Sequence, residues 1–210
     1  MRRYTFGLIL FAAAACAATL AHAQAEDERV FLLVAKPGMQ DPVFERTVVL
    51  AVRADDGGPI GVILNRPSTI SLHALLPDRA DTADRNDPVF IGGPIESDAL
   101  LFAFRAASKP ARGLSVADDI YISGFSEVLA QVLGHPENAA QQRFFTGFAG
   151  WAAGQLEQEI EHGGWFVLQF DARAVFDMNP LTIYEELLQR ATAPGIETAR
   201  AIHLARAHSR

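Results

Sequence analysis

Apolar and polar residues follow one another in short runs along this chain, and the runs predict strands more often than helices. Residues 30–35 are continuously apolar, as expected of a strand that is covered on both faces. Residues 47–53 are rich in β-branched side chains, and residues 60–64 return as another strand after an Asp- and Gly-rich turn at 55–58. The first third of the chain is therefore predicted to form a buried strand followed by a hairpin.

Beyond the hairpin, apolar runs alternate with breaks rich in glycine, proline and charge. Residues 78–87 are charged and residues 106–117 have no regular period, so both are predicted loops. Ser68 or Ser71 could cap a brief helix before the loop 78–87. Further strands are predicted at 89–91, 99–104, 120–122, 143–148 and 165–170.

Helical periodicity is clearest at 125–133, where Phe125 begins a series of apolar residues at i, i+3, i+4, i+7 and i+8. Ser123 is the predicted cap and Gly134 the predicted end. Residues 179–191 are predicted to form another helix, which an Asn-Pro pair opens. Its inward face is predicted to consist of Leu181, Tyr184, Leu188 and Ala191.

The order of these elements favours an α+β fold. Strands and helices are interspersed, but two strands form a hairpin and helices are few, which argues against a doubly wound parallel sheet. The sequence has no internal repeat and no linker long enough to divide domains. Residues 24–195 are therefore predicted to form a single domain.

The stretch 146–166 is predicted to contain the end of a strand, a glycine turn, one short helix, a glycine stop and a second strand. A helical wheel places four apolar side chains of this helix within one arc, where they would face the core. These side chains belong to Ala152, Ala153, Leu156 and Ile160.

A second set of side chains lies beside that arc. Trp151, Gln155 and Glu159 stand at i, i+4 and i+8, and core packing does not obviously require them. Aromatic and amide side chains suit recognition, because they bring contact area and directed hydrogen bonds. This set is a candidate surface for a ligand or a partner protein. The alternative is that the indole covers the margin of the core and Gln155 bonds to backbone groups.

Four polar residues at predicted strand ends and loops form a second candidate site. They are Asp41, Arg46, Asn65 and Arg66. Two guanidinium groups and an amide could receive a small anionic ligand or a carboxylate, because a guanidinium presents a bidentate fork. The alternative is that Asp41 caps a turn and the arginines form ordinary ion pairs near the sheet edge.

Motifs for catalysis and metal binding are missing from the sequence. The glycines at 92–94 and 147–154 lack the Lys-Ser/Thr pair of a phosphate loop, and no His-Glu-x-x-His pattern occurs. The residues around Ser115 lack the second glycine of a nucleophile elbow. We therefore assign no catalytic residue, no metal ligand and no cofactor from the sequence.

The first 23 residues have the three parts of a cleaved export signal. An arginine pair precedes the apolar run 4–20, and Ala21-His22-Ala23 has the small-x-small pattern of a cleavage site. The run is short for a membrane span, so we predict a periplasmic or secreted protein without a membrane anchor. A lipoprotein linked through Cys16 is less favoured, because position 13 lacks the leucine usual at such sites.

Cleavage of residues 1–23 would leave a more acidic chain without cysteine. It leaves 16 basic against 25 acidic residues, a formal charge of −9, which argues against general nucleic-acid binding. Cys16 is the only cysteine, so packing and not disulfides must hold the mature domain. Residues 196–210 are predicted to be a basic tail that is poorly ordered or helical.

Four blocks of the sequence carry a resemblance to a known family. They are PGMQDPVFERTVV at 37–49, GVILNRP at 61–67, GGPI at 92–95 and GFAGWAAGQLEQE at 147–159. In this order they resemble the YqgE/AlgH family of bacterial proteins, over roughly residues 30–191. The resemblance implies an α+β fold with a bifurcated mixed sheet that curls into a pseudo-barrel with helices packed against it. It implies no catalytic residues, and members are generally cytoplasmic and often described as regulators.

Three functional hypotheses follow from the sequence. The first is a non-enzymatic binding or regulatory domain in the periplasm, with the regions of Arg66 and Trp151 as its recognition surface. The second is a hydrolase or transferase for a small anionic substrate, with Asp41 or Glu159 as acid or base and Arg46 or Arg66 holding the anion. The third is an assembly module that forms a homodimer through an exposed surface.

Overall fold

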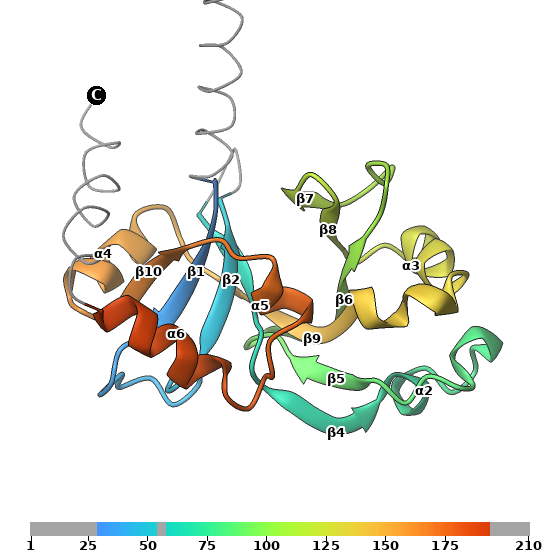
Figure 1. The fold of residues 1–210 in the computed structure, drawn as a ribbon, viewed down its shortest axis with the longest axis horizontal. Helices are drawn as coiled ribbons and strands as arrows, with labels where there is room; N and C mark the ends of the chain where they lie inside the picture. The colour runs from blue at the N-terminus through green and yellow to red at the C-terminus, as the bar shows by residue number, and fades with distance from the viewer. Residues whose placement is uncertain (1–28, 54–57, 194–210) are drawn as a thin grey trace, which may run out of the picture.

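The computed structural model describes residues 29–53 and 58–193 (Figure 1). The predicted export signal, the tail at 196–210 and most of the predicted hairpin turn lie outside these residues. The strands are β1 (Val30–Ala35), β2 (Val48–Val52), β3 (Ile60–Ile63), β4 (Pro67–Ser71), β5 (Pro88–Ile91), β6 (Ile95–Arg105), β7 (Leu114–Ala117), β8 (Ile120–Ser123), β9 (Gln142–Gly150) and β10 (Trp165–Gln169). The helices are α2 (Leu72–Leu75), α3 (Ser126–Leu133), α4 (Gln155–Glu161), α5 (Arg173–Phe176) and α6 (Ile183–Thr192), with 3-10 turns η1 (Ala80–Thr82) and η2 (Pro136–Gln141).

The sheet divides at β9, which confirms the bifurcated mixed sheet. Its main path runs in the order β10-β1-β2-β3-β9-β6-β8-β7. One edge of β9 pairs with β6, whereas the other edge pairs first with β5, in parallel, and then with β3. Gly147 lies at this division with φ +67, and a Cβ there would stand 2.5 Å from the Gly93 carbonyl oxygen. The glycine segments therefore serve close backbone approach, as the absence of phosphate-loop residues indicated.

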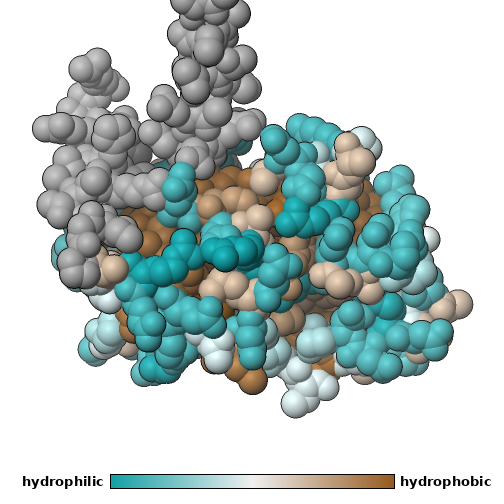
Figure 2. All heavy atoms as spheres, in the orientation of Figure 1, coloured by the Kyte–Doolittle hydropathy of each residue, from teal (hydrophilic) through white to brown (hydrophobic). Residues whose placement is uncertain are grey.

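Helices cover the two parts of the sheet separately. In Figure 1, α5 and α6 lie against β1 and β2 on one side, and α3 lies beside β6 on the other. The larger core includes the fully apolar strands β1 and β2, every residue of which is buried. Figure 2 shows hydrophilic residues over most of the viewed face, with hydrophobic residues visible between them near its centre.

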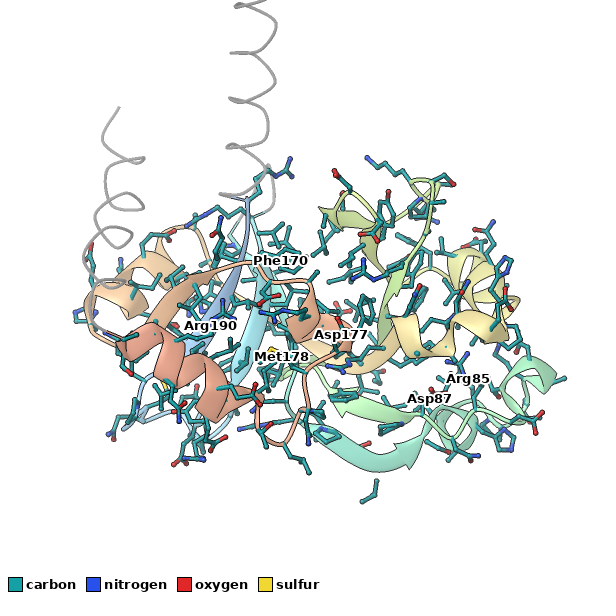
Figure 3. The ribbon with its side chains drawn as sticks, viewed as in Figure 1. Arg85, Asp87, Phe170, Asp177, Met178 and Arg190 are labelled. Atoms are coloured by element: carbon teal, nitrogen blue, oxygen red, sulfur yellow. The ribbon has the colours of Figure 1, made fainter. Side chains whose placement is uncertain are left out.

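The smaller core, under α3, is closed by a buried polar group. The Arg85 guanidinium donates to the Asp87 carboxylate at 2.6 Å and to the Gln142 side-chain oxygen at 2.9 Å. Figure 3 shows Arg85 and Asp87 side by side near α2. This group ties the charged segment 78–87 to the start of β9, so the predicted loop is anchored and includes one 3-10 turn.

Most predicted elements are confirmed, including the hairpin of β2 and β3, the Ser71 cap of α2 and the end of α3 at Gly134. The short elements β4, β7 and α5 were not predicted. No helix among the described residues is both long enough and apolar enough to cross a membrane.

Four predicted core positions are wrong, because α3, α4 and α6 each begin later than predicted. Gly154 adopts a left-handed conformation with φ +77, so α4 starts only at Gln155. The residues before it are in the open connection from β9. Ala152 and Ala153 are therefore exposed. Phe125 precedes α3, which starts at Ser126, and Leu181 precedes α6, which starts at Ile183. Both are exposed, Leu181 by 75%.

Candidate functional site

The candidate site is built where three elements meet beside β1. The loop 36–47 leaves the end of β1, where Ala35 pairs with Trp165, the first residue of β10. The Lys36 amide donates to the Gly164 carbonyl at 2.9 Å, which holds the loop against the start of β10. Helix α4 connects β9 to β10, so it arrives at the same place. Strand pairing thus brings the loop and the helix together although more than 100 residues separate them.

Three aromatic rings form the wall between these elements. Phe44 of the loop lies 6.2 Å from Trp151 and 5.5 Å from Trp165 between ring centroids. The two indoles meet edge to face at 6.2 Å, a favoured arrangement of aromatic pairs. Both are almost fully buried, with 6% and 1% exposed. Trp151 therefore covers the margin of the core, which is the alternative that the sequence analysis gave for it. Its indole nitrogen also bonds to a polar group.

That polar group is the carboxylate of Glu159. Its Oε2 accepts hydrogen bonds from the indole Nε1 of Trp151 and of Trp165, each at 2.9 Å. Its Oε1 accepts from the side-chain amide of Gln155 at 2.9 Å. Gln155 in turn accepts from the Ala152 amide at 3.0 Å, which fixes the direction of its side chain. The carboxylate thus has three donors, and all three are neutral.

A pocket of about 520 Å³ opens over this group, between the loop and the polar face of α4. Its volume lies within the range of small-molecule sites, about 300–1,000 Å³. It is lined by Pro37, Gly38, Met39, Gln40, Asp41, Phe44, Gly150, Trp151, Gln155, Gln158, Glu159, His162, Gly163, Gly164 and Trp165. Four of the seven residues proposed from the sequence are in this set, namely Asp41, Trp151, Gln155 and Glu159.

The other three proposed residues lie outside the pocket and hold the loop in place. Asn65 accepts from the Val48 amide at 2.8 Å and donates to the Arg46 carbonyl at 2.9 Å. Arg66 donates to the Pro42 and Glu45 carbonyls at 3.3 and 3.2 Å, and burial lowers its pKa below the ordinary value. Both side chains thus satisfy loop backbone groups.

Arg46 also has internal partners. Its guanidinium pairs with the Glu185 carboxylate and lies 4.8 Å from the Tyr184 ring centroid. The Tyr184 hydroxyl donates to the Ala35 carbonyl at 3.0 Å, so this group connects the loop to α6 and β1. The ion-pair alternative proposed from the sequence describes Arg46 correctly.

Asp41 has one role in the loop and a second position on the pocket. Its Oδ1 accepts from the Val43 amide at 2.8 Å, and its carbonyl accepts from the amides of Phe44 and Glu45. It therefore caps a tight turn, as the sequence alternative stated. The turn also places its exposed carboxylate at the pocket wall.

Sequence reasoning missed Phe44, Trp165 and His162. The chain has two tryptophans, and one stands on each side of a single short helix. That pattern could have indicated Trp165 as a site residue, whereas no local feature of the sequence indicates Phe44 as one. Within the described residues, no three His, Cys, Asp or Glu side chains gather as a metal site.

A family model described as AlgH-like matches residues 32–194. The chain belongs to the AlgH-like family. The match includes all the pocket residues and all the strands except the first two residues of β1. The resemblance inferred from the four sequence blocks is confirmed.

Relatives in other bacteria support the same assignment. A UPF0301 protein of Streptomyces coelicolor is 35% identical over 168 residues, covering 76% of this chain and 84% of that protein. A UPF0301 protein of an Azoarcus species is 33% identical over 178 residues, covering 82% and 92%. The names of these relatives assign no biochemical activity to them.

Two solved structures share the fold. The solution structure of the AlgH protein from Pseudomonas aeruginosa has a TM-score of 0.63 and 26% identity, covering 86% of this chain and 94% of that one. A crystal structure of a Corynebacterium diphtheriae protein has a TM-score of 0.64 and 24% identity, covering 78% and 87%. The α+β fold with a curled, divided sheet is therefore the fold of the AlgH-like family.

Proposed function

We propose that this AlgH-like protein is a non-enzymatic binding or regulatory domain and that the pocket over Glu159 is its ligand site. One observation carries the proposal. Donors from the end of β9, from α4 and from β10 converge on a single carboxylate beneath an aromatic-walled pocket. A binding pocket of this kind combines apolar walls with a few fixed polar groups. The two indole N–H groups need an acceptor in that position, but a neutral amide oxygen could serve, so packing does not require the negative charge.

The geometry gives no support to the hydrolase or transferase hypothesis. That hypothesis needs an acid or base and a guanidinium in one cleft. Asp41 and Glu159 line the pocket, but neither Arg46 nor Arg66 does. Both guanidinium groups already bind other groups of the protein. The prediction of a small anionic ligand depended on the same two arginines, so we do not retain it.

We also propose that the protein acts outside the cytoplasm. The support is the sequence of residues 1–23 and the lack of cysteine after them. Mass spectrometry of the protein from a periplasmic fraction would test this. We expect a mature chain that begins at Gln24, and a chain that keeps Met1 in the cytoplasmic fraction would contradict the proposal.

The binding proposal can be tested with the protein's own fluorescence. Both tryptophans line the pocket, so emission from any other site does not interfere. A panel of nucleotides, sugars, organic acids, amines and short peptides would be screened by emission and by thermal unfolding. We expect at least one ligand class to change the emission and to raise the Tm, because binding to the native state stabilises it.

Two variants make the test specific. Gln155→Ala removes one donor to Glu159, and we expect it to weaken binding at least several-fold. Gln189→Ala is the matched control, since Gln189 is exposed on α6 and does not line the pocket. If no compound in the panel binds, or if both variants bind as the wild type does, the pocket is not the ligand site.

A further inference from the structure

We propose that the pocket selects an organic cation, namely an ammonium or guanidinium group on an apolar stem. This inference depends on the proposed function, because it names the ligand class of the same site. The acidic side chains that line the pocket are not matched by any described Lys or Arg. Asp41 and Glu159 line it, and no Lys or Arg among the described residues does.

The charge of Glu159 is solvated by the protein but is not neutralised. Two indole N–H groups and one amide replace water around the carboxylate, and none of them carries a positive charge. Among the described residues, no Lys, Arg or His forms an ion pair with Glu159. Glu157 on the same helix differs, because Arg53 pairs with it at 2.7 Å. The negative charge of Glu159 is therefore available to a ligand.

Glu159 also keeps hydrogen-bonding capacity. A carboxylate oxygen can accept two hydrogen bonds, and Oε1 accepts one, from Gln155. His162 is the one other ionisable side chain on the described wall. Its Nδ1 lies 2.8 Å from the Gln158 carbonyl oxygen at the end of α4. A carbonyl oxygen can only accept a hydrogen bond, so Nδ1 carries a proton and donates a hydrogen bond to the helix end.

Asp41 adds the second negative charge at the rim. Its Oδ1 is used in the turn, at 2.8 Å from the Val43 amide. Burial lowers the pKa of Arg66, and the nearby negative charge of Asp41 acts in the opposite direction. The two charges are therefore close enough for Arg66 to offset part of the negative charge of Asp41. The Arg66 guanidinium nevertheless bonds to loop carbonyls and does not line the pocket. Asp41 is exposed and Glu159 is half-buried, so a cation entering the pocket would meet Asp41 before Glu159.

The walls match the stem of such a ligand. Met39, Phe44 and Pro37 line the same pocket as the two carboxylates and supply apolar surface. Aromatic faces attract cations, and carboxylates repel anions, so both features favour the same ligand class. A metal ion is a poorer fit, because the described residues provide no group of three acidic or histidine ligands.

Titration of tryptophan emission in the full chain would test the ligand class. The probes are Nα-acetyl-lysine methylamide, its neutral norleucine analogue and its anionic glutamate analogue, with agmatine as a free cation. We expect both cations to bind at least about tenfold more tightly than the neutral analogue and the anion not to bind. We also expect the affinity for cations to fall as salt is added. If only agmatine binds, the natural ligand is a free amine; if only the capped lysine binds, it is a peptide side chain.

Charge-neutral variants separate the two carboxylates from the rest of the surface. Asp41→Asn keeps the turn acceptor and Glu159→Gln keeps an acceptor for the indoles, and we expect each to weaken cation binding several-fold. Glu161→Gln is the matched control, because Glu161 is exposed on α4 and outside the pocket. Equal weakening by all three variants would indicate a general charge effect and would overturn the inference.

The inference and the proposed function fail in different ways. If the neutral or anionic analogue binds as tightly as the cations, or another class from the wider panel binds and requires Gln155, the pocket is a binding site but not for cations. If no probe and no panel compound changes the emission, both proposals are wrong.

Discussion

Two carboxylates in this molecule each collect several hydrogen bonds, but from different donors. Asp171, just before α5, accepts from the backbone and guanidinium of Arg173 and from Arg190 of α6, at 2.8–3.1 Å. Figure 3 shows Arg190 on α6. Glu159 accepts from two indoles and an amide, all at 2.9 Å. Among the described residues, the first carboxylate therefore has cationic partners and the second has only neutral ones.

The difference separates a structural carboxylate from a candidate binding group. The hydrogen bonds from Arg173, and then the one from Arg190, lower the pKa of Asp171 to about 2, and its charge is compensated within the fold. Glu159 is held as firmly, but its charge remains at the base of a pocket. The number of hydrogen bonds thus does not reveal the role of a carboxylate, whereas the charge of its donors does.

The largest predicted effect is the loss of the acceptor that the two indoles share. Glu159→Leu would leave the buried N–H groups of Trp151 and Trp165 without a partner, at a cost of about 2–4 kcal/mol of unfolding free energy. Glu159→Gln keeps a carbonyl oxygen for them and should cost about 1 kcal/mol. Urea denaturation followed by far-UV circular dichroism would measure both values.

Glu161→Leu provides the comparison on the same helix. Glu161 is exposed, so we expect a change within about 0.5 kcal/mol. If Glu159→Leu costs no more than this control, the indole hydrogen bonds do not stabilise the protein and the description of Glu159 is wrong.

The next effect concerns Asp171 and depends on pH. Its pKa is about 2 in the folded protein and about 3.9 in an unfolded chain, so its ionised form stabilises the fold above about pH 5. That stabilisation disappears as pH falls toward 2. At pH 7, Asp171→Asn should cost about 1 kcal/mol, because the arginine partners are largely exposed and solvent screens the charges. The two proteins should converge in stability between pH 5 and 2.

Unfolding in urea at pH 7, 5, 4 and 3 would measure this convergence. Asp119→Asn is a suitable control, since Asp119 is a half-exposed carboxylate that pairs with one arginine of the described chain, Arg105. A difference between wild type and Asp171→Asn that stays constant down to pH 3 would show that Asp171 is not held by its cations.

Local sequence was sufficient for the parts of the fold whose burial is uniform. Strands β1 and β2 are buried at every residue, so their apolar runs were diagnostic. Strand β4 contains a proline and three polar residues, and it pairs only with β5 at an edge of the sheet. An edge strand needs little apolar surface, so the sequence of β4 has no alternation of apolar and polar residues that would predict a strand.

The candidate site was predicted in part, from a helical spacing that holds for only some of its residues. Trp151, Gln155 and Glu159 do meet, but Trp151 follows strand β9 and does not belong to α4. Phe44 and Trp165 join them because β1 pairs with β10, and this long-range pairing leaves no trace in local periodicity. Arg66 was proposed from its chemistry and its place at a predicted strand end, and only the geometry of loop 36–47 shows that its guanidinium bonds to loop carbonyls.

The smallest predicted effect uses salt to distinguish the two carboxylates. Arg190→Met should cost only a few tenths of a kcal/mol, because Arg190 is 45% exposed and Asp171 keeps Arg173 as a partner. Added salt screens exposed charges, so 0.5 M NaCl should remove most of this difference. The cost of Glu159→Leu should not change, since its partners are neutral and buried. Thermal unfolding of both variants at low and high salt would measure the contrast, and an equal response to salt would refute it.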